Sequence, residues 1–337
     1  MSYKSIIKSI ILHGIDLFGI YKLLCRFSKT PIVVFWHGVS ENPDQVVEGE
    51  SFPVSLFVKQ VDYLVHNYDV ISIEEFYNRY KNETLTNREV VLTFDDGYKN
   101  NLEVAAPILK KRGLPFTVFV SAQNVSEQER FYILVPRMII IGGELDEVEI
   151  PSMNYKRRLT SLADRIACAH EIEYKIKYFT HEKAKQVAAE LINYIGKEHY
   201  SSLCESHSNG EMLTWDDVRK LISDYDCTIG SHCMDHCICH SSQQLNEVEW
   251  QLSESKKLIE KETGKECRYF AYPNGDYTVE TNALVKKYYK MGFSTDIVPI
   301  VAGGSDEASI GRVGVPLSLI EFKFLLSKLA LRQIFNG

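Results

Sequence analysis

Two adjacent carboxylates, Asp95 and Asp96, lie between the apolar run 90–94 and Gly97. Adjacent side chains in a regular strand face opposite ways, but a turn at the strand end lets both reach one cavity. There, one carboxylate can bind a cation while the other takes up a proton. Acidic residues at such positions are also common as turn or helix-capping residues. The pair alone therefore leaves a catalytic and a structural interpretation open.

Two histidines, His232 and His236, are the second candidate feature. A four-residue spacing places two imidazoles on one face of a helical turn, which is a common arrangement of metal ligands. Two histidines and one carboxylate leave coordination positions open for water and substrate, as in catalytic sites. A metal held in this way lowers the pKa of a water molecule to roughly 7 and polarises a carbonyl group.

The same stretch offers a structural zinc site as an alternative. Its histidines and cysteines are His232, Cys233, His236, Cys237, Cys239 and His240. Structural zinc sites usually combine two separated ligand clusters, and no second cysteine pair occurs elsewhere in the sequence. We therefore interpret the three cysteines as small packing residues near the site.

Short runs of β-branched and aromatic residues alternate with amphipathic helical stretches from Pro31 onward. The predicted strands cover 32–35, 70–72, 90–94, 116–120, 228–229, 269–272 and 293–295. This alternation predicts an α/β fold with a parallel sheet, either open or closed into a barrel. Chemistry in such folds gathers where strands end and the following loops begin. Both candidate features occupy such positions. The segment from about 126 to 211 interrupts the alternation with a helical pattern, and we predict that it is an insertion covering one side of the barrel.

The N-terminal segment and the bulk composition suggest the cellular setting. Apolar residues recur at three- and four-residue steps in 1–28, which predicts an amphipathic helix packed on the domain or lying on a membrane surface. We see no signal-peptide pattern, and the eight cysteines do not resemble a disulfide framework. We therefore expect a cytoplasmic protein, with membrane association left open. The net charge of −7 gives no basic footprint, so we expect no nucleic-acid partner.

Three segments resemble, in order, the motifs of the polysaccharide deacetylase family, the NodB-homology group of carbohydrate esterases. They are TFDDGY at 93–98, GSHCMDH at 230–236 and RYFAYPNG at 268–275. The sequence LTWD at 213–216 resembles the approach to the second motif in relatives that work in polysaccharide assembly. The similarity covers about 32–329 apart from the insertion, and we assign 29–332 to one deacetylase domain.

The resemblance implies a distorted (β/α) barrel of about seven strands. It also implies that Asp95 is the general base and that Asp96, His232 and His236 hold a divalent metal, zinc or else cobalt or nickel. The metal and the backbone N–H of Tyr98 would stabilise the oxyanion that forms when water attacks an acetamide carbonyl.

Two departures from the family pattern concern charged side chains. Many members have an arginine before the third motif's proline that pairs with the base, and here Ala271 occupies that position. Arg268 or Arg312 is the candidate replacement, and Arg312 is also a candidate substrate contact. The late histidine that supplies the general acid is not recognisable in 310–315. His37, which follows the first strand, is a candidate catalytic residue, although a structural hydrogen bond is an equal interpretation.

The implied substrate is an N-acetylated glycan, with Trp215, Tyr272 and Pro273 lining its groove. The leading hypothesis is hydrolysis of an N-acetyl group from an amino sugar in a polysaccharide or in its biosynthetic intermediate. A non-sugar amide hydrolase is one alternative. A glycan-binding protein with impaired catalysis is another, because Ala271 and the missing histidine would slow the reaction.

Overall fold

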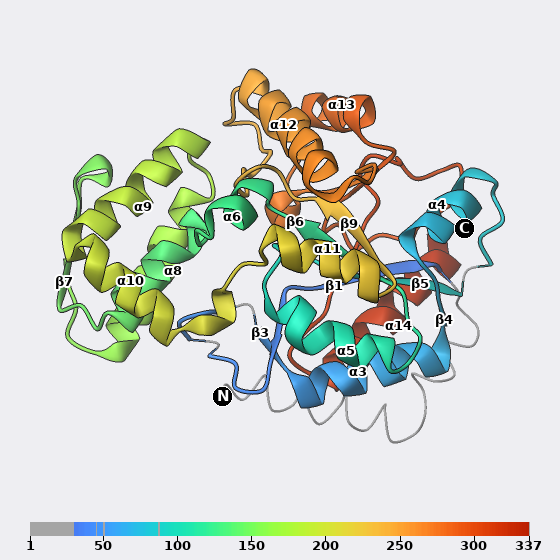
Figure 1. Ribbon diagram of the computed structural model, residues 1–337, viewed down its shortest axis with the longest axis horizontal. Coiled ribbons are helices and arrows are strands. Elements are labelled where there is room, and N and C mark those ends of the chain that lie inside the picture. Colours follow the sequence, from blue (N-terminus) through green and yellow to red (C-terminus); the bar gives the residue numbers. More distant parts are fainter. Residues whose placement is uncertain (1–29, 45, 50, 87, 337) are drawn as a thin grey trace.

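The computed structural model describes residues 30–336 except 45, 50 and 87, with side chains up to residue 329. The helix expected in 1–28 lies outside these residues. In the described chain, one sheet is built from parallel pairs only. Its strands are β1 (Ile32–Trp36), β4 (Asp69–Val70), β5 (Glu89–Phe94), β6 (Phe116–Val120), β9 (Cys227–Ser231), β10 (Tyr269–Ala271), β11 (Met291–Phe293) and β12 (Val313–Gly314). Their order is β11-β10-β9-β6-β5-β1-β12, and β4 pairs with the start of β5 (Figure 1).

One segment near the C-terminus connects the two edges of this sheet. Ile310 forms a parallel bridge with Phe293 in β11. Three residues later, Val313 in β12 pairs with Val34 in β1. The curled sheet is therefore closed by this segment, which confirms the predicted distorted (β/α) barrel.

Alternation along the strands separates two apolar layers. The inner layer includes Val33, Val91, Phe119, Ala271, Met291 and Phe293, together with Ile73, Phe76 and Tyr80 from helix α4 (Ile73–Lys81). Helix α4 begins after Ser72, which caps it: the Ser72 hydroxyl accepts from the Glu75 N–H at 3.1 Å. The outer layer packs beneath the surrounding helices. Because both faces of the strands are buried, the strands are nearly continuous apolar runs, which made them recognisable in the sequence.

The helices around the barrel occupy both sides of the sheet in Figure 1. They are α3 (Val54–Asn67), α5 (Ala106–Lys110), α11 (Trp215–Asp224), α12 (Leu245–Thr263), α13 (Val279–Tyr288) and α14 (Leu319–Asn336). Helices α3, α5 and α14 lie below the sheet in this view, and α12 and α13 lie above it (Figure 1). A short parallel pair, β2 (Gly38–Ser40) with β3 (Ser51–Pro53), lies outside the main sheet. Within the described part of the chain, the cysteines are free thiols and no helix is long and apolar enough to cross a membrane.

The segment predicted to be an insertion stands to the left of the barrel in Figure 1. After α6 (Ala122–Glu127) it contains α7 (Val135–Arg137), α8 (Leu162–Ile176), α9 (His181–Ile195) and α10 (Lys197–Ser206), in keeping with its helical pattern. It also contains an antiparallel pair, β7 (Glu147–Ile150) with β8 (Tyr155–Arg158), which the sequence analysis did not predict. Strand β8 has the sequence YKRR, which gives no alternation of apolar and polar residues.

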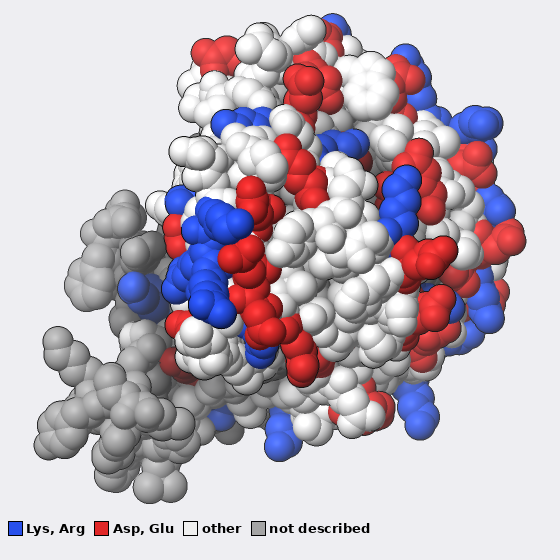
Figure 2. All heavy atoms as spheres, turned by 90° about the vertical axis from the view of Figure 1, so that its left-hand side faces the viewer, with Lys and Arg blue, Asp and Glu red and all other residues white. Residues whose placement is uncertain are grey.

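Charged side chains of both signs lie next to one another on the side that carries this segment (Figure 2). Lys156 lies 3.2 Å from Glu147 and 2.7 Å from Glu149, and Arg157 lies 3.2 Å from Glu171. These pairs largely compensate the basic charges of β8. This face is therefore not a uniformly basic surface.

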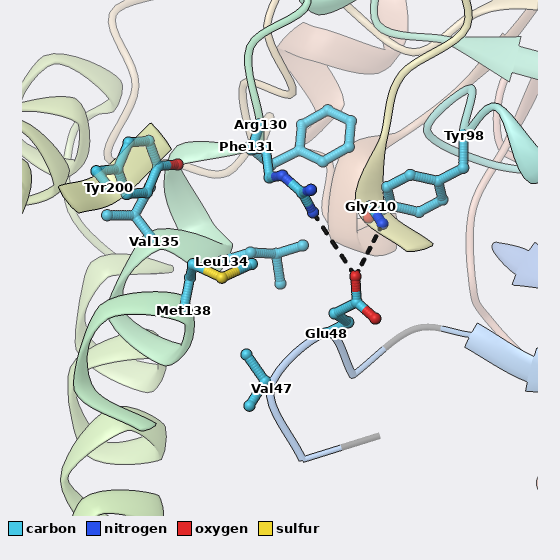
Figure 3. A pocket seen from close by; sticks show the side chains of 10 residues that line it. All are labelled: Val47, Glu48, Tyr98, Arg130, Phe131, Leu134, Val135, Met138, Tyr200 and Gly210. Atoms are coloured by element: carbon cyan, nitrogen blue, oxygen red, sulfur yellow. Dashed lines mark hydrogen bonds and ion pairs between the residues drawn. The ribbon is translucent and has the colours of Figure 1, made fainter. Parts of the chain in front are cut away.

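A buried acidic side chain joins the barrel to both ends of the same segment (Figure 3). Glu48 lies 3.8 Å from Arg130 and accepts a hydrogen bond from the Gly210 N–H at 3.2 Å. The cavity beside it, next to Tyr98 and Phe131, measures about 10 Å³, which is room for one water molecule at most. We interpret this region as a packed contact that fixes the inserted segment against the barrel.

Candidate functional site

The four central candidate residues meet at the carboxyl ends of two strands. Asp95 and Asp96 directly follow β5, and His232 directly follows β9. The Nε2 atoms of His232 and His236 lie 3.5 and 3.6 Å from the same Asp96 oxygen, Oδ1. All four residues line one pocket of about 310 Å³. The structure therefore brings together residues that are up to 141 positions apart, with 236 − 95 = 141.

Unusual backbone angles aim these side chains at one point. Asp96 has φ = 77°, and Gly97 follows with φ = 87°. A Cβ atom on Gly97 would lie only 3.0 Å from a Val120 methyl group, so space as well as angle favours glycine. Cys233 and His236 also have positive φ values, 65° and 60°. The histidines therefore converge through a strained turn and not through the helical turn that their spacing suggested.

The chemistry of the three clustered side chains suits a divalent cation. One carboxylate oxygen and two imidazole nitrogens, from Asp96, His232 and His236, lie within 4.8 Å of one another. Nδ1 of His232 lies 2.8 Å from the Ala271 carbonyl oxygen, so this nitrogen donates and Nε2 keeps its lone pair. Burial is the main cause that lowers the pKa of His232 to about 4. Neutral imidazole is the form that binds metals.

The imidazole of His236 is held in its neutral form by similar causes. Burial is the main cause that keeps its pKa well below the usual value, and the neighbouring His232, His37 and Lys177 lower it further. Its ring also packs against Phe131, with 5.0 Å between the ring centroids. Both histidines are therefore fixed in the form and the direction that a metal requires.

Asp95 forms a buried, two-pronged ion pair with Arg312. Nη1 and Nη2 of Arg312 each lie 2.7 Å from one carboxylate oxygen, and the guanidinium carbon lies 4.5 Å from the Phe35 ring centroid. Burial alone would raise the pKa of Asp95, but the charge and the hydrogen bonds of Arg312 outweigh it and the pKa is lowered. The carboxylate is therefore ionised near neutral pH.

This pair locates the guanidinium that the third motif lacks. Arg312 comes from the segment that closes the barrel, whereas Ala271 lies at the end of β10. Arg268, the other candidate, lies 2.6 Å from both Glu74 and Glu266 and is bound to these two residues. Of the two replacements considered, Arg312 is the one that reaches Asp95.

The loop between the two histidines is held by a buried carboxylate, Asp235. Its Oδ1 lies 2.8 Å from Nε2 of His181 and accepts a hydrogen bond from Gln251 Nε2 at 2.7 Å. Its Oδ2 lies 2.5 Å from Nζ of Lys185. Gln251 also accepts from the Met234 N–H at 2.9 Å. Side chains from α9 and α12 thus bind the loop from two sides. The sequence analysis did not recognise these contacts.

The other predicted site residues take different positions. His37, Tyr98 and Tyr272 line the pocket, whereas Pro273 is buried and is not among the lining residues. Trp215 begins α11 and donates from Nε1 to the Ser126 hydroxyl at 2.8 Å, and it is not among the residues that line the pocket. The predicted roles of these side chains stay predictions.

Several lining residues were missed by the sequence analysis because they belong to the segment 126–211. They are Phe131, Ile133, Leu134, Arg137, Glu173 and Lys177. Arg137 and Glu173 face each other across 36 sequence positions, so no local spacing marks them as a pair. This segment therefore forms one wall of the pocket.

The sequence profile described as polysaccharide deacetylase matches residues 82–292. The Bacillus subtilis (strain 168) protein YxkH is 27% identical over 81 residues, a match that spans 22% of this chain and 29% of YxkH. IcaB from Ammonifex degensii is 17% identical, with a TM-score of 0.56 and coverage of 90% of this chain and 97% of IcaB. The Streptococcus pyogenes deacetylase PplD is 16% identical, with a TM-score of 0.57 and coverage of 90% and 99%.

Proposed function

The chain belongs to the polysaccharide deacetylase family, and on this premise we propose that it removes N-acetyl groups from an amino sugar in a metal-dependent hydrolysis. The observation that carries the proposal is the placement of Asp95 and its arginine beside the Asp96, His232 and His236 cluster in one pocket. This arrangement combines an ionised base with a set of metal ligands.

The metal is proposed to be zinc, with cobalt or nickel as alternatives, because the ligands are two imidazole nitrogens and one carboxylate oxygen. When bound, such an ion polarises the acetamide carbonyl and makes a water molecule more acidic. His232 is oriented for this role by its contact with the Ala271 carbonyl, and His236 by its packing against Phe131.

The protein's own groups then move the protons. Asp95 accepts a proton from the attacking water, and Arg312 orients the carboxylate and keeps it ionised until then. The Tyr98 N–H is proposed to donate to the oxyanion. His37 lines the pocket and is the candidate for protonating the departing amine, a role that the sequence left without a recognisable residue.

The substrate is proposed to be an N-acetylated glycan or its biosynthetic intermediate. Support comes from PplD, which is described as a deacetylase in complex with acetate and shares the fold. The alternative of a glycan-binding protein with impaired catalysis rested on two observations, Ala271 in place of an arginine and the missing late histidine. The Asp95–Arg312 pair answers the first, because Arg312 supplies the guanidinium beside Asp95. A cytoplasmic location with peripheral membrane contact stays a prediction.

Acetate release tests this function. We expect the zinc-loaded protein to release acetate from N-acetylglucosamine oligomers, and we expect Asp95→Asn to lower kcat by 10²-fold or more, because the base is lost. Asp69→Asn is the matched control, since Asp69 lies at the opposite end of the barrel, at the start of β4. Sugar binding without acetate release by the metal-saturated wild type would support the impaired alternative instead.

A further inference from the structure

The wall formed by the segment 126–211 brings charged side chains into the pocket. Arg137 ends α7, Glu173 lies in the last turn of α8, and Lys177 follows α8 directly. All three line the same pocket as Asp95 and His236. None of them is needed for the proposed proton transfers, so their charges call for a separate explanation.

Two of these three charges satisfy each other. Nε and Nη2 of Arg137 donate to the two Glu173 carboxylate oxygens at 2.9 and 2.8 Å. Only 16% and 11% of these side chains is exposed, so the pair is well shielded from water. Glu173 lies four residues before Lys177, a spacing that often allows an ion pair, but within the described residues its ion pair is with Arg137.

Lys177 is thus left as an uncompensated cation on the wall. Its side chain is half-buried, and within the described part of the chain its ammonium group lies within 4.0 Å of no carboxylate. Lys175, two residues earlier, shows the usual arrangement, since its Nζ lies 2.7 Å from Glu171. A cleft wall with one unpaired positive charge attracts anions, and its low-dielectric surroundings strengthen that attraction.

We propose that Lys177 binds an anionic group of the substrate, which makes the substrate an acetamido sugar that carries a phosphate or a carboxylate. This inference rests on the proposed function and names the class of sugar on which that site acts. An ammonium group on a flexible stem binds phosphate or carboxylate as a point charge. Selectivity would then come from the inserted wall, while the barrel supplies the reaction.

A structural role for Lys177 makes a different prediction. A cation at the C-terminal end of a helix interacts favourably with the helix dipole, and Lys177 follows the last turn of α8. In that case, removing the charge would lower the melting temperature slightly and would affect charged and neutral ligands alike. The structural role and the anion-binding role are therefore distinguished by comparing the affinities for charged and neutral ligands.

The test measures binding by calorimetry to the full zinc-loaded chain, without turnover. The probes are N-methylsulfonyl-glucosamine, in which a sulfonamide replaces the hydrolysable acetamide, its 1-phosphate, and the corresponding uronate. We expect the wild type to bind at least one charged probe about tenfold more tightly than the neutral probe, as a charge-assisted contact allows. The phosphate and uronate arms show which anion the site prefers.

Three variants assign this preference to one side chain. Lys177→Gln should reduce the ratio of charged to neutral affinity to below threefold, and Lys177→Arg should retain most of it. Lys175→Gln removes the same charge two residues away and should leave the ratio unchanged. A wild type without preference, or with no binding of the charged probes, overturns the inference, as does a Lys177→Gln variant that keeps the wild-type ratio. Acetate release from neutral oligomers is measured separately, so a failure of the proposed function is seen independently.

Discussion

Replacing Arg312 by methionine should cost the most free energy of unfolding among the site variants considered. The substitution keeps an unbranched chain of similar volume but leaves the Asp95 carboxylate, whose side chain is 4% exposed, without its two 2.7 Å contacts. Breaking a buried pair by removing one partner costs about 3–5 kcal/mol, because the remaining charge is uncompensated. We expect a loss of this size at pH 7 in urea unfolding.

The same variant should show a pH dependence with a definite sign. In the wild type the pKa of Asp95 is lowered below its ordinary value of 3.8, so the pair contributes stability above that pH and loses it as the pH falls through the folded-state pKa. Without Arg312, burial dominates and raises the pKa of Asp95 above 3.8. The ionised carboxylate then destabilises the variant increasingly as the pH rises. The difference from wild type should therefore be largest at pH 7 and smaller near pH 4, and the acid limb of the rate profile should move to higher pH.

Controls separate charge from packing in this experiment. The double variant Asp95→Asn with Arg312→Met removes the buried charge and should recover much of the lost stability. Arg268→Met removes a partly exposed arginine with two carboxylate partners and should cost about 1 kcal/mol or less. Equal losses of stability at pH 7 and pH 4, with no recovery in the double variant, would refute the electrostatic argument.

Two further predictions concern the proposed metal. His236→Ala should abolish tight zinc binding, measured by competition with a chelator, and acetate release with it. The control is His66→Ala, which replaces an exposed histidine on α3 and should bind zinc like the wild type. Unchanged zinc affinity in His236→Ala would contradict the ligand assignment. Asp235→Asn weakens the contacts that hold the loop to α9, and we expect about 10–100-fold weaker zinc binding, as for other residues that orient metal ligands. Tight zinc binding by this variant, together with a lower melting temperature, would show that Asp235 stabilises the fold without positioning His236.

The sequence was sufficient for the features that are local along the chain. The strands appeared as apolar runs because both of their faces are buried. The proposed metal ligands followed strand ends, where residues such as Gly97 indicate a turn. The partner of Asp95 was beyond such reasoning. Arg312 lies 217 positions away, and it meets Asp95 only because the segment 310–314 closes the barrel. Closure of a sheet is a property of all its strands together, so a spacing rule cannot reveal it.

The pocket has one wall from the strand ends of the barrel and another from the inserted segment, and the two walls have different proposed roles. Asp95, Asp96 and His232 directly follow strands whose backbones are held by the hydrogen bonds of the parallel sheet. Lys177 directly follows α8 of the inserted segment and belongs to none of the strands, so its charge can vary without disturbing them. The two walls are nevertheless linked, because Asp235 ties the histidine loop to Lys185 on α9 in the same inserted segment. A change in the insertion that displaced α9 would therefore weaken metal binding as well as substrate selection, and this coupling restricts how freely the insertion can be exchanged.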